Sequence, residues 1–198
     1  RSQQLANQAT VEGRFEREII PVVDADGKSM TTDEGLRDTT VESLGKLKPS
    51  FKEDGKVTAG NSSQITDGAS AVLIMSEERA NQLGLKPRAR FVSFALAGAD
   101  PRLMLTAPIP ATSKALERAG LTLDQIDLTE INEAFASVVL AWEKEHHPDM
   151  SKVNVKPESA LIESGVSTRL PAHAETPITM NAGNSKPMVA ITGKTSQR

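Results

Sequence analysis

The sequence predicts an α/β protein, and three stretches carry that prediction. Residues 126–142 place alternating apolar side chains ahead of a helical stripe that ends at Trp142, which is typical of a short strand followed by a helix. Residues 69–75 are apolar without alternation, as expected for a parallel strand covered on both faces. Residues 90–97 predict the next strand, with a helix between the two.

The first third of the chain predicts smaller elements. Residues 1–11 form a helix that ends at Gly13, and residues 15–23 form a strand. Asp24–Gly27 is a hairpin turn, from which residues 28–32 return.

The remaining helices are predicted from start and stop signals. A capping box at residues 39–42 opens a short helix that Pro49 stops, and Ser76 opens a helix that Gly84 ends. Residues 100–111 contain prolines that predict a loop, and residues 112–120 predict an amphipathic helix with Ala115, Leu116 and Ala119 facing inward. Residues 188–191 can form a last strand.

Composition bounds the class of protein. The chain has 198 residues, 38% of them hydrophobic, which is enough for a core. Its net charge of −3 has the two signs interspersed, so nothing indicates nucleic-acid binding or an anionic membrane surface. No apolar run has the length of a membrane span, and residues 1–4 do not form a signal peptide. We expect a soluble cytoplasmic protein, or one of an organellar matrix.

The chain contains no cysteine. Disulfides, thiolate metal sites and a cysteine nucleophile supplied by these residues are therefore excluded. The adjacent His146 and His147 point in different directions on a helix and have no third ligand at a suitable spacing, so a solvated helix end is the better interpretation and no metal site is predicted.

Asn132 is the leading candidate for a functional residue. It stands where the strand passes into the helix, and an Asn at a helix N-cap satisfies a backbone N–H at the positive end of the helix dipole. The carboxyl ends of strands in α/β proteins open the crevices that bind ligands. The alternative is that Asn132 is only a cap and Phe135 only core.

The motif Asn-Glu-Ala-Phe-Ala at residues 132–136, which follows the predicted strand containing Glu130, resembles the thiolase superfamily. The resemblance implies that Asn132 positions a catalytic water or helps form the oxyanion hole around a thioester. It also implies that Ala134 and Phe135 border the pantetheine arm of coenzyme A, which is a substrate as CoA or acyl-CoA; no covalently bound cofactor is implied.

Further stretches resemble the same family. Residues 33–37 and 44–51 match the loop domain that thiolases insert to hold coenzyme A, which makes Arg37 the candidate for its phosphates because a guanidinium binds phosphate oxygens as a fork. Ser43 and Phe51 are lesser contacts of the same kind. The alternative for Arg37 is an ordinary surface arginine.

Two more contacts are implied by resemblance. Residues 57–69 resemble a thiolase segment in which the serine that matches Ser63 contacts the pantetheine. The alternative, which composition alone favours, is that these residues form only a tight turn. Met104 lies near the acyl pocket; as a single Met it is more often a gap filler in a core.

The resemblance also implies an architecture. It is a thiolase-like layered αβαβα core, incomplete here, with an inserted α+β loop domain. Residues 1–66 correspond to the loop domain, residues 67–87 to the last strand and helix of the N-terminal core domain, and residues 88–198 to the C-terminal core domain, altered after about residue 155. Complete members of the family are homo-oligomers.

The catalytic groups of the family are largely absent. The Gly-His-Pro motif expected after residue 155 is missing, and Asn181 stands where thiolases carry their second cysteine. The nucleophilic cysteine belongs to the half that precedes Arg1 in the family. We therefore expect an acyl-CoA C-acyltransferase fragment of β-oxidation or acyl-CoA condensation type, inactive as an isolated chain, because catalytic groups that act as a unit fail together. The alternative is a non-catalytic module that binds acyl-CoA or pairs subunits.

Overall fold

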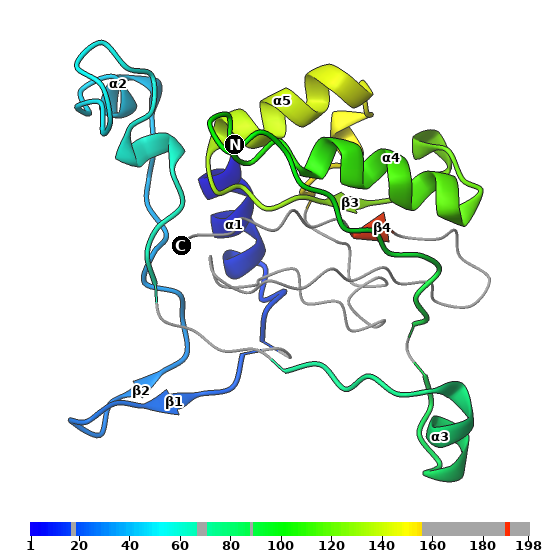
Figure 1. Ribbon diagram of the computed structural model, residues 1–198. Coiled ribbons are helices and arrows are strands. Elements are labelled where there is room, and N and C mark those ends of the chain that lie inside the picture. Colours follow the sequence, from blue (N-terminus) through cyan, green and yellow to red (C-terminus); the bar gives the residue numbers. More distant parts are fainter. Residues whose placement is uncertain (17–18, 67–70, 88, 156–188, 191–198) are drawn as a thin grey trace. The chain divides into compact units, whose positions relative to one another are not determined.

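The computed structural model describes residues 1–16, 19–66, 71–87, 89–155 and 189–190 (Figure 1). The chain forms two compact units that divide between Gly60 and Asn61. Every helix in the described ranges is too short or too polar to cross a membrane.

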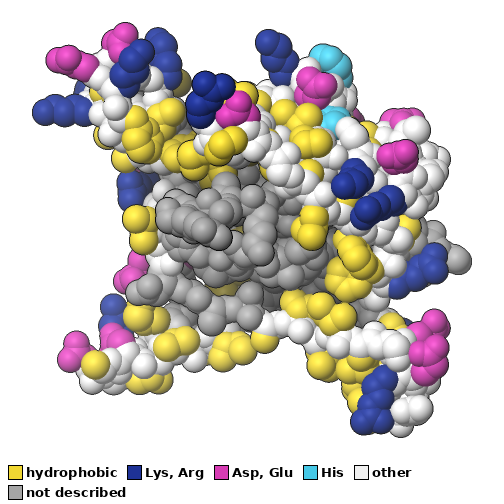
Figure 2. All heavy atoms as spheres, in the orientation of Figure 1, with side chains coloured by type: hydrophobic (Ala, Val, Ile, Leu, Met, Phe, Trp, Pro, Cys, Tyr) yellow, Lys and Arg dark blue, Asp and Glu magenta, His cyan; other side chains and the backbone are white. Residues whose placement is uncertain are grey.

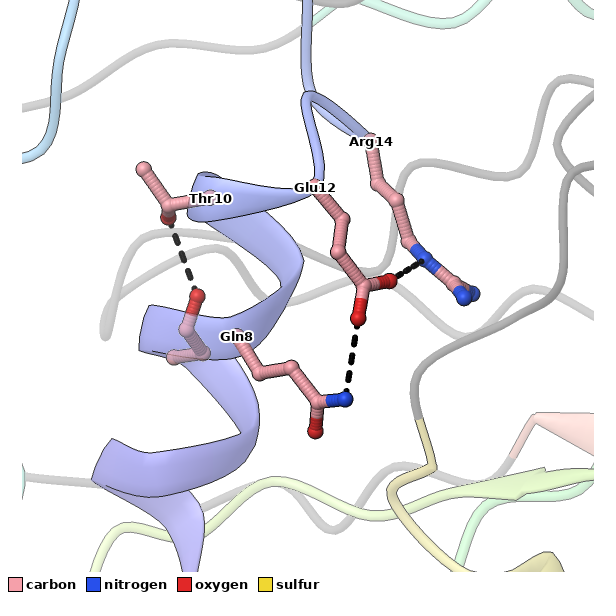
Figure 3. Close-up of polar contacts among 5 residues, drawn as sticks. Gln8, Thr10, Glu12 and Arg14 are labelled. Atoms are coloured by element: carbon pink, nitrogen blue, oxygen red, sulfur yellow. Dashed lines mark hydrogen bonds and ion pairs between the residues drawn. The ribbon is translucent and has the colours of Figure 1, made fainter.

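The first unit opens with α1 (Ser2–Val11), which confirms the predicted N-terminal helix. Gly13 ends it with a φ of 68°, a left-handed conformation that costs glycine little. Polar side chains brace this end: Gln8 Nε2 donates to Glu12 Oε1 at 2.9 Å, and Arg14 Nε donates to Glu12 Oε2 at 2.9 Å (Figure 3). Both bonds are at the surface, so they contribute little to stability.

The predicted hairpin is confirmed, with shorter strands. β1 (Val22–Val23) pairs antiparallel with β2 (Ser29–Met30). The carboxylate of Asp24 accepts hydrogen bonds from the N–H groups of Asp26 and Lys28, which fixes the turn. The prediction that the strand begins at Phe15 is wrong, because residues 12–16 form turns that continue from α1.

The second short helix of this unit is α2 (Val41–Leu44). Its capping box is formed by Thr40 and Ser43, one residue later than predicted from Thr39. Glu42 therefore lies in the first turn, where hydrogen bonds to the backbone and to Thr40 hold its pKa below the usual range.

Gly60, in η1 (Ala59–Asn61), lies against α2 and the residues after it. A Cβ at this position would contact Leu44 Cδ2 and would lie 2.7 Å from Leu47 Cδ1. A larger residue here would displace the ends of these two leucine side chains, so packing rather than the φ angle favours glycine.

The second unit contains the longer elements. Its helices are α3 (Glu77–Gln82), α4 (Pro108–Ala119) and α5 (Ala136–His146), with 3₁₀ turns η2 (Leu123–Gln125) and η3 (Met150–Lys152). β3 (Thr129–Glu130) pairs in parallel with β4 (Val189–Ala190), which lies inside the strand predicted at 188–191.

Trp142 is the centre of the core of this unit. Its side chain is 1% exposed and packs with Val139 of α5 and with Ile131 and Val153. The indole Nε1 donates to Thr112 Oγ1 of α4 at 2.8 Å, so the buried N–H is satisfied. This bond links α5 to α4, and Figure 1 shows both helices in the same part of the chain.

α4 begins four residues earlier than predicted, at Pro108. Pro108 and Pro110, which predicted a loop, lie in its first turn, where a missing N–H costs no helical hydrogen bond. Of the residues predicted to face inward, Ala115 and Leu116 are buried and Ala119 is partly buried. Gly120 ends the helix with a φ of 65°.

Two predicted strands do not form in the described residues. Residues 71–75 have no ladder, and Val72, Leu73 and Ile74 are 54%, 76% and 58% exposed. Figure 2 shows such hydrophobic side chains on the surface of the described parts. A buried parallel strand needs neighbours on both edges, which the described residues do not supply here.

Residues 90–97 are extended without a ladder among the described residues, yet they alternate as a strand does. Ser93 and Ala95 are buried, whereas Phe94 and Leu96 are exposed. Side chains of α4 bond the backbone instead: Arg118 donates to Phe94 O at 2.8 Å and Lys114 to Leu96 O at 3.3 Å. The extended backbone agrees with the strand predicted at residues 90–97, whereas the hydrogen-bonded ladder of that strand does not form among the described residues.

Glu130 of β3 is only partly exposed. Burial, and next to it the negative charge of Glu133, raise the pKa of Glu130 to about 8 from its ordinary 4.5. Its carboxyl is therefore mostly protonated at neutral pH.

We expect Gly60→Ala to lower the free energy of unfolding of the first unit by up to about 1 kcal/mol, because the added methyl displaces only the flexible ends of the Leu44 and Leu47 side chains. Urea denaturation measures the loss, and hydrogen exchange of the amides of Leu44 and Leu47 assigns it to this unit. Gly98→Ala is the control, since a Cβ there meets nothing within 4 Å. Equal stability of the two variants would contradict the packing role of Gly60.

We expect the second unit to lose stability as the pH rises from about 4.5 to about 8, because the unfolded carboxyl of Glu130 ionises first. The slope is at most about 1.4 kcal/mol per pH unit, and stability is greatest below the unfolded pKa. Urea denaturation at several pH values measures it. Glu130→Gln should flatten the decline, and Glu117→Gln on the exposed face of α4 should not; an unchanged decline in Glu130→Gln would show that another group is responsible.

Candidate functional site

Asn132 lies in a loop, not at a helix N-cap. α5 begins at Ala136 with Phe135 as its N-cap, and no side chain caps it. The prediction that the strand passes directly into the helix is therefore wrong, since residues 131–135 intervene. The side chain of Asn132 is exposed, and its amide has no hydrogen-bond partner among the described residues.

The neighbours of Asn132 are held by Asn154. Ile131 N–H donates to Asn154 Oδ1 at 2.8 Å, and Asn154 Nδ2 donates to Ile131 O at 2.9 Å and to Glu133 Oε1 at 2.8 Å. Asn154 was not predicted as a site residue, because its partners lie more than twenty positions earlier in the chain. No local pattern in the sequence marks Asn154, and only the folded chain shows that it has a φ of 47°, a region in which Asn is enriched.

The structure brings three predicted pantetheine contacts together. Ser62 forms an antiparallel bridge with Phe135, and Ser63 N–H donates to Ala134 O at 2.9 Å. The two segments are about seventy residues apart in the sequence, so backbone pairing alone places Ser63 beside Ala134 and Phe135. Asn132 lies two residues before Ala134 in the same loop.

This arrangement presents polar groups of defined chemistry. The backbone N–H of Ser63 is used in the pairing, whereas its side chain is exposed and has no hydrogen-bond partner among the described residues. A hydroxyl can donate to or accept from an amide, and the amide of Asn132 offers two N–H donors and an oxygen acceptor. Ala134 and Phe135 are partly buried and add apolar surface between them.

Met104 is separate from this group in the hydrogen-bonding pattern. It lies in a turn where its N–H donates to Asp100 O, its φ is 47°, and its side chain is 46% exposed. Asp100 in turn accepts from Arg102 N–H and side chain, which holds the pKa of Asp100 below its usual range.

The other predicted contacts lie in the first unit. Arg37 is exposed, its N–H donates to Gln3 Oε1 at 3.0 Å, and its guanidinium has no ion pair among the described residues. Phe51 is 76% exposed. The Ser43 hydroxyl donates to Thr40 O at 2.9 Å and accepts from Thr40 N–H, so it is already engaged in the capping box.

The prediction that His146 and His147 form a solvated helix end holds for only one of the two residues. His147 is exposed, whereas His146 is partly buried, its Nε2 lies 3.1 Å from Ile109 O, and its ring lies 5.4 Å from that of Trp142. Within the described residues, no cluster of three His, Asp or Glu side chains could hold a metal ion. Asn181 and the altered stretch after residue 155 lie outside the described residues.

Comparison with known proteins gives the family. The family model described as thiolase, N-terminal domain, matches residues 1–78, and that described as thiolase, C-terminal domain, matches residues 85–161. An acetyl-CoA acetyltransferase of Syntrophomonas wolfei subsp. wolfei is 52% identical over 160 residues, which are 78% of this chain and 40% of that protein.

Solved structures agree with this result. Human mitochondrial 3-ketoacyl-CoA thiolase in complex with CoA matches with a TM-score of 0.74 and 46% identity, over 78% of this chain and 39% of the human chain. The dimeric peroxisomal thiolase of Saccharomyces cerevisiae matches with a TM-score of 0.74 and 42% identity, over 77% of this chain and 39% of the yeast chain. The fold is therefore the α/β fold of these enzymes, and the chain, which spans about two fifths of its relatives' length, belongs to the thiolase family.

Proposed function

We propose that this chain is part of a thiolase-type acyl-CoA C-acyltransferase, which cleaves 3-ketoacyl-CoA by thiolysis or condenses acyl-CoA molecules. Relatives with these activities in their names support the proposal. The observation that carries it is the pairing of Ser62–Ser63 with Ala134–Phe135 beside the exposed Asn132. The human relative is described in complex with CoA, which supports coenzyme A as the ligand.

In this proposal Ser63, Ala134 and Phe135 hold the pantetheine arm. The Ser63 hydroxyl donates to an amide carbonyl of pantetheine, which has two amides along its length. Ala134 has only a methyl, so the arm can pass close to the backbone, and Phe135 supplies an apolar border. The pairing that uses the Ser63 N–H leaves the hydroxyl for the ligand.

Asn132 contributes a hydrogen-bond donor at the thioester. An amide does not exchange a proton near neutral pH, so Asn132 acts by orienting water or by stabilising negative charge on the thioester oxygen. Loss of one such donor typically costs about 10²–10³ in rate. The exposed amide without a partner among the described residues is available for this role.

The nucleotide end is assigned to the first unit. Arg37 binds phosphate oxygens, with Phe51 and Ser43 as lesser contacts, and Met104 borders the acyl group.

The chain divides in this proposal into the predicted domains, namely a loop domain at 1–66, the end of the N-terminal core domain at 67–87 and the C-terminal core domain at 88–198. A homo-oligomer is part of it, supported by the dimeric yeast relative, and the cytoplasmic or organellar-matrix location stays a prediction.

A second candidate is a non-catalytic module that binds acyl-CoA or pairs subunits. The observation that favours it is Asn181, which stands where thiolases carry their second cysteine, because an amide does not exchange a proton near neutral pH. The two candidates share the coenzyme A site and differ in whether an acyl group is transferred.

We expect coenzyme A to raise the melting temperature of the chain. Ligand at about 100 times its Kd adds about 2.7 kcal/mol, which is about 5–10 °C for a chain of this size. Arg37→Ala and Ser63→Ala should each weaken binding about tenfold or more, measured by calorimetry, because each removes a hydrogen-bonding group. Arg79→Ala on α3 is the control. No response at millimolar coenzyme A would contradict the binding site.

We expect no thiolysis of acetoacetyl-CoA by the isolated 198-residue chain, because it supplies no nucleophilic cysteine. Loss of the substrate's ultraviolet absorbance in the presence of coenzyme A measures the reaction, with an intact thiolase as the positive control. Turnover that co-purifies with the chain and disappears in Asn132→Ala would overturn the inactivity.

A further inference from the structure

Asn154 forms hydrogen bonds with the main chain of Ile131 on one side of Asn132 and with the side chain of Glu133 on the other. The Ile131 N–H and C=O are both paired with the Asn154 amide, at 2.8 and 2.9 Å, and Glu133 Oε1 accepts from the same amide nitrogen at 2.8 Å. Asn132 is the residue between these two fixed points. Its own amide makes none of these bonds and stays exposed.

The geometry at Asn154 requires this residue type. Its N–H donates to Thr129 O at 2.9 Å, which continues the parallel bridge between Thr129 and Val153. The chain then turns with a φ of 47°, so its backbone leaves the ladder and the side-chain amide pairs with Ile131 in its place. Asn tolerates a positive φ and offers both a donor and an acceptor, whereas Asp offers acceptors alone.

The bonds of Asn154 are made to the loop rather than to the helices. Ile131 and Val153 are already buried against Trp142, so apolar packing holds this region without the amide. What the amide adds is the orientation of the polar main chain from Ile131 to Glu133. Removing it should therefore loosen the loop while α4 and α5 stay folded.

We propose that Asn154 is a positioning residue that fixes the loop carrying Asn132, so that the Asn132 amide is oriented before an acyl-CoA thioester binds. This inference rests on the proposed function for its ligand. Asn154 acts through Ile131 and Glu133 and does not touch the thioester. Displacement of a catalytic group by about 1 Å can cost about 10²-fold in rate, which gives such a residue its importance.

The first test needs no ligand. Asn154→Gly removes the amide and keeps the φ of 47°, and His147→Gly is the matched control, because His147 has the same φ at the exposed end of α5. We expect hydrogen exchange at Ile131 N–H to become about tenfold faster in Asn154→Gly, as for the loss of one ordinary hydrogen bond. The ¹⁵N heteronuclear NOE at Asn132 should fall, while the amides of α5 keep their protection.

A second variant separates the two sides of the amide. Asn154→Asp keeps an acceptor for Ile131 N–H, loses the donor to Ile131 O and Glu133, and places a carboxylate beside the carboxylate of Glu133. We expect Ile131 exchange close to that of the unaltered chain, but a lowered NOE at Asn132. This variant also keeps the test informative if Asn154→Gly does not fold.

The ligand arm compares acetyl-CoA with coenzyme A. In the unaltered chain, acetyl-CoA should shift the Asn132 side-chain amide signals more than coenzyme A does, and in Asn154→Gly this difference should disappear while the Kd of coenzyme A changes less than twofold. Unchanged Ile131 exchange and an unchanged Asn132 NOE in Asn154→Gly would overturn the inference. A loosened loop in a chain whose Asn132 ignores both ligands would support the positioning by Asn154 and contradict the proposed function instead.

Discussion

The second unit depends on the burial of Trp142. Its indole packs with Ile131 and Val153, which immediately precede Asn132 and Asn154 in the sequence. The indole N–H donates a hydrogen bond to Thr112 of the neighbouring helix. Burial of an aromatic side chain contributes several times the stability of a surface ion pair. Because Ile131 and Val153 are anchored there, Asn154 is brought within reach of the Asn132 loop.

Two kinds of interaction then build the site on this base. Apolar packing sets the position of α5 and of the segments beside it, and hydrogen bonds of polar groups set the orientation of the loop. The pairing of Ser63 with Ala134 is of the second kind and joins segments from far apart in the chain. Hydrogen bonds are directional and packing is not, so orientation in this site depends on few groups.

Exposed apolar segments are the other feature of this unit. Residues 71–75 and the outward side chains of residues 90–97 have the composition of strands buried in a sheet, yet they are exposed in the described structure. The chain spans about two fifths of the length of its thiolase relatives. The apolar composition of a strand suits its burial within a sheet, whereas a hydrogen-bonded ladder forms only where neighbouring strands are present.

The sequence by itself determined the family, the helices and the spacing of their buried faces. Local patterns predict these features, namely the Asn-Glu-Ala-Phe motif, the helix ends at Gly13, Gly84 and Gly120, and the buried positions of α4. Tertiary structure alone decided that Asn132 is a loop residue, that Ser63 lies beside Ala134, and that Asn154 holds the loop. These results come from hydrogen bonds between residues about twenty to seventy positions apart, and such partners leave no periodic signal in the sequence.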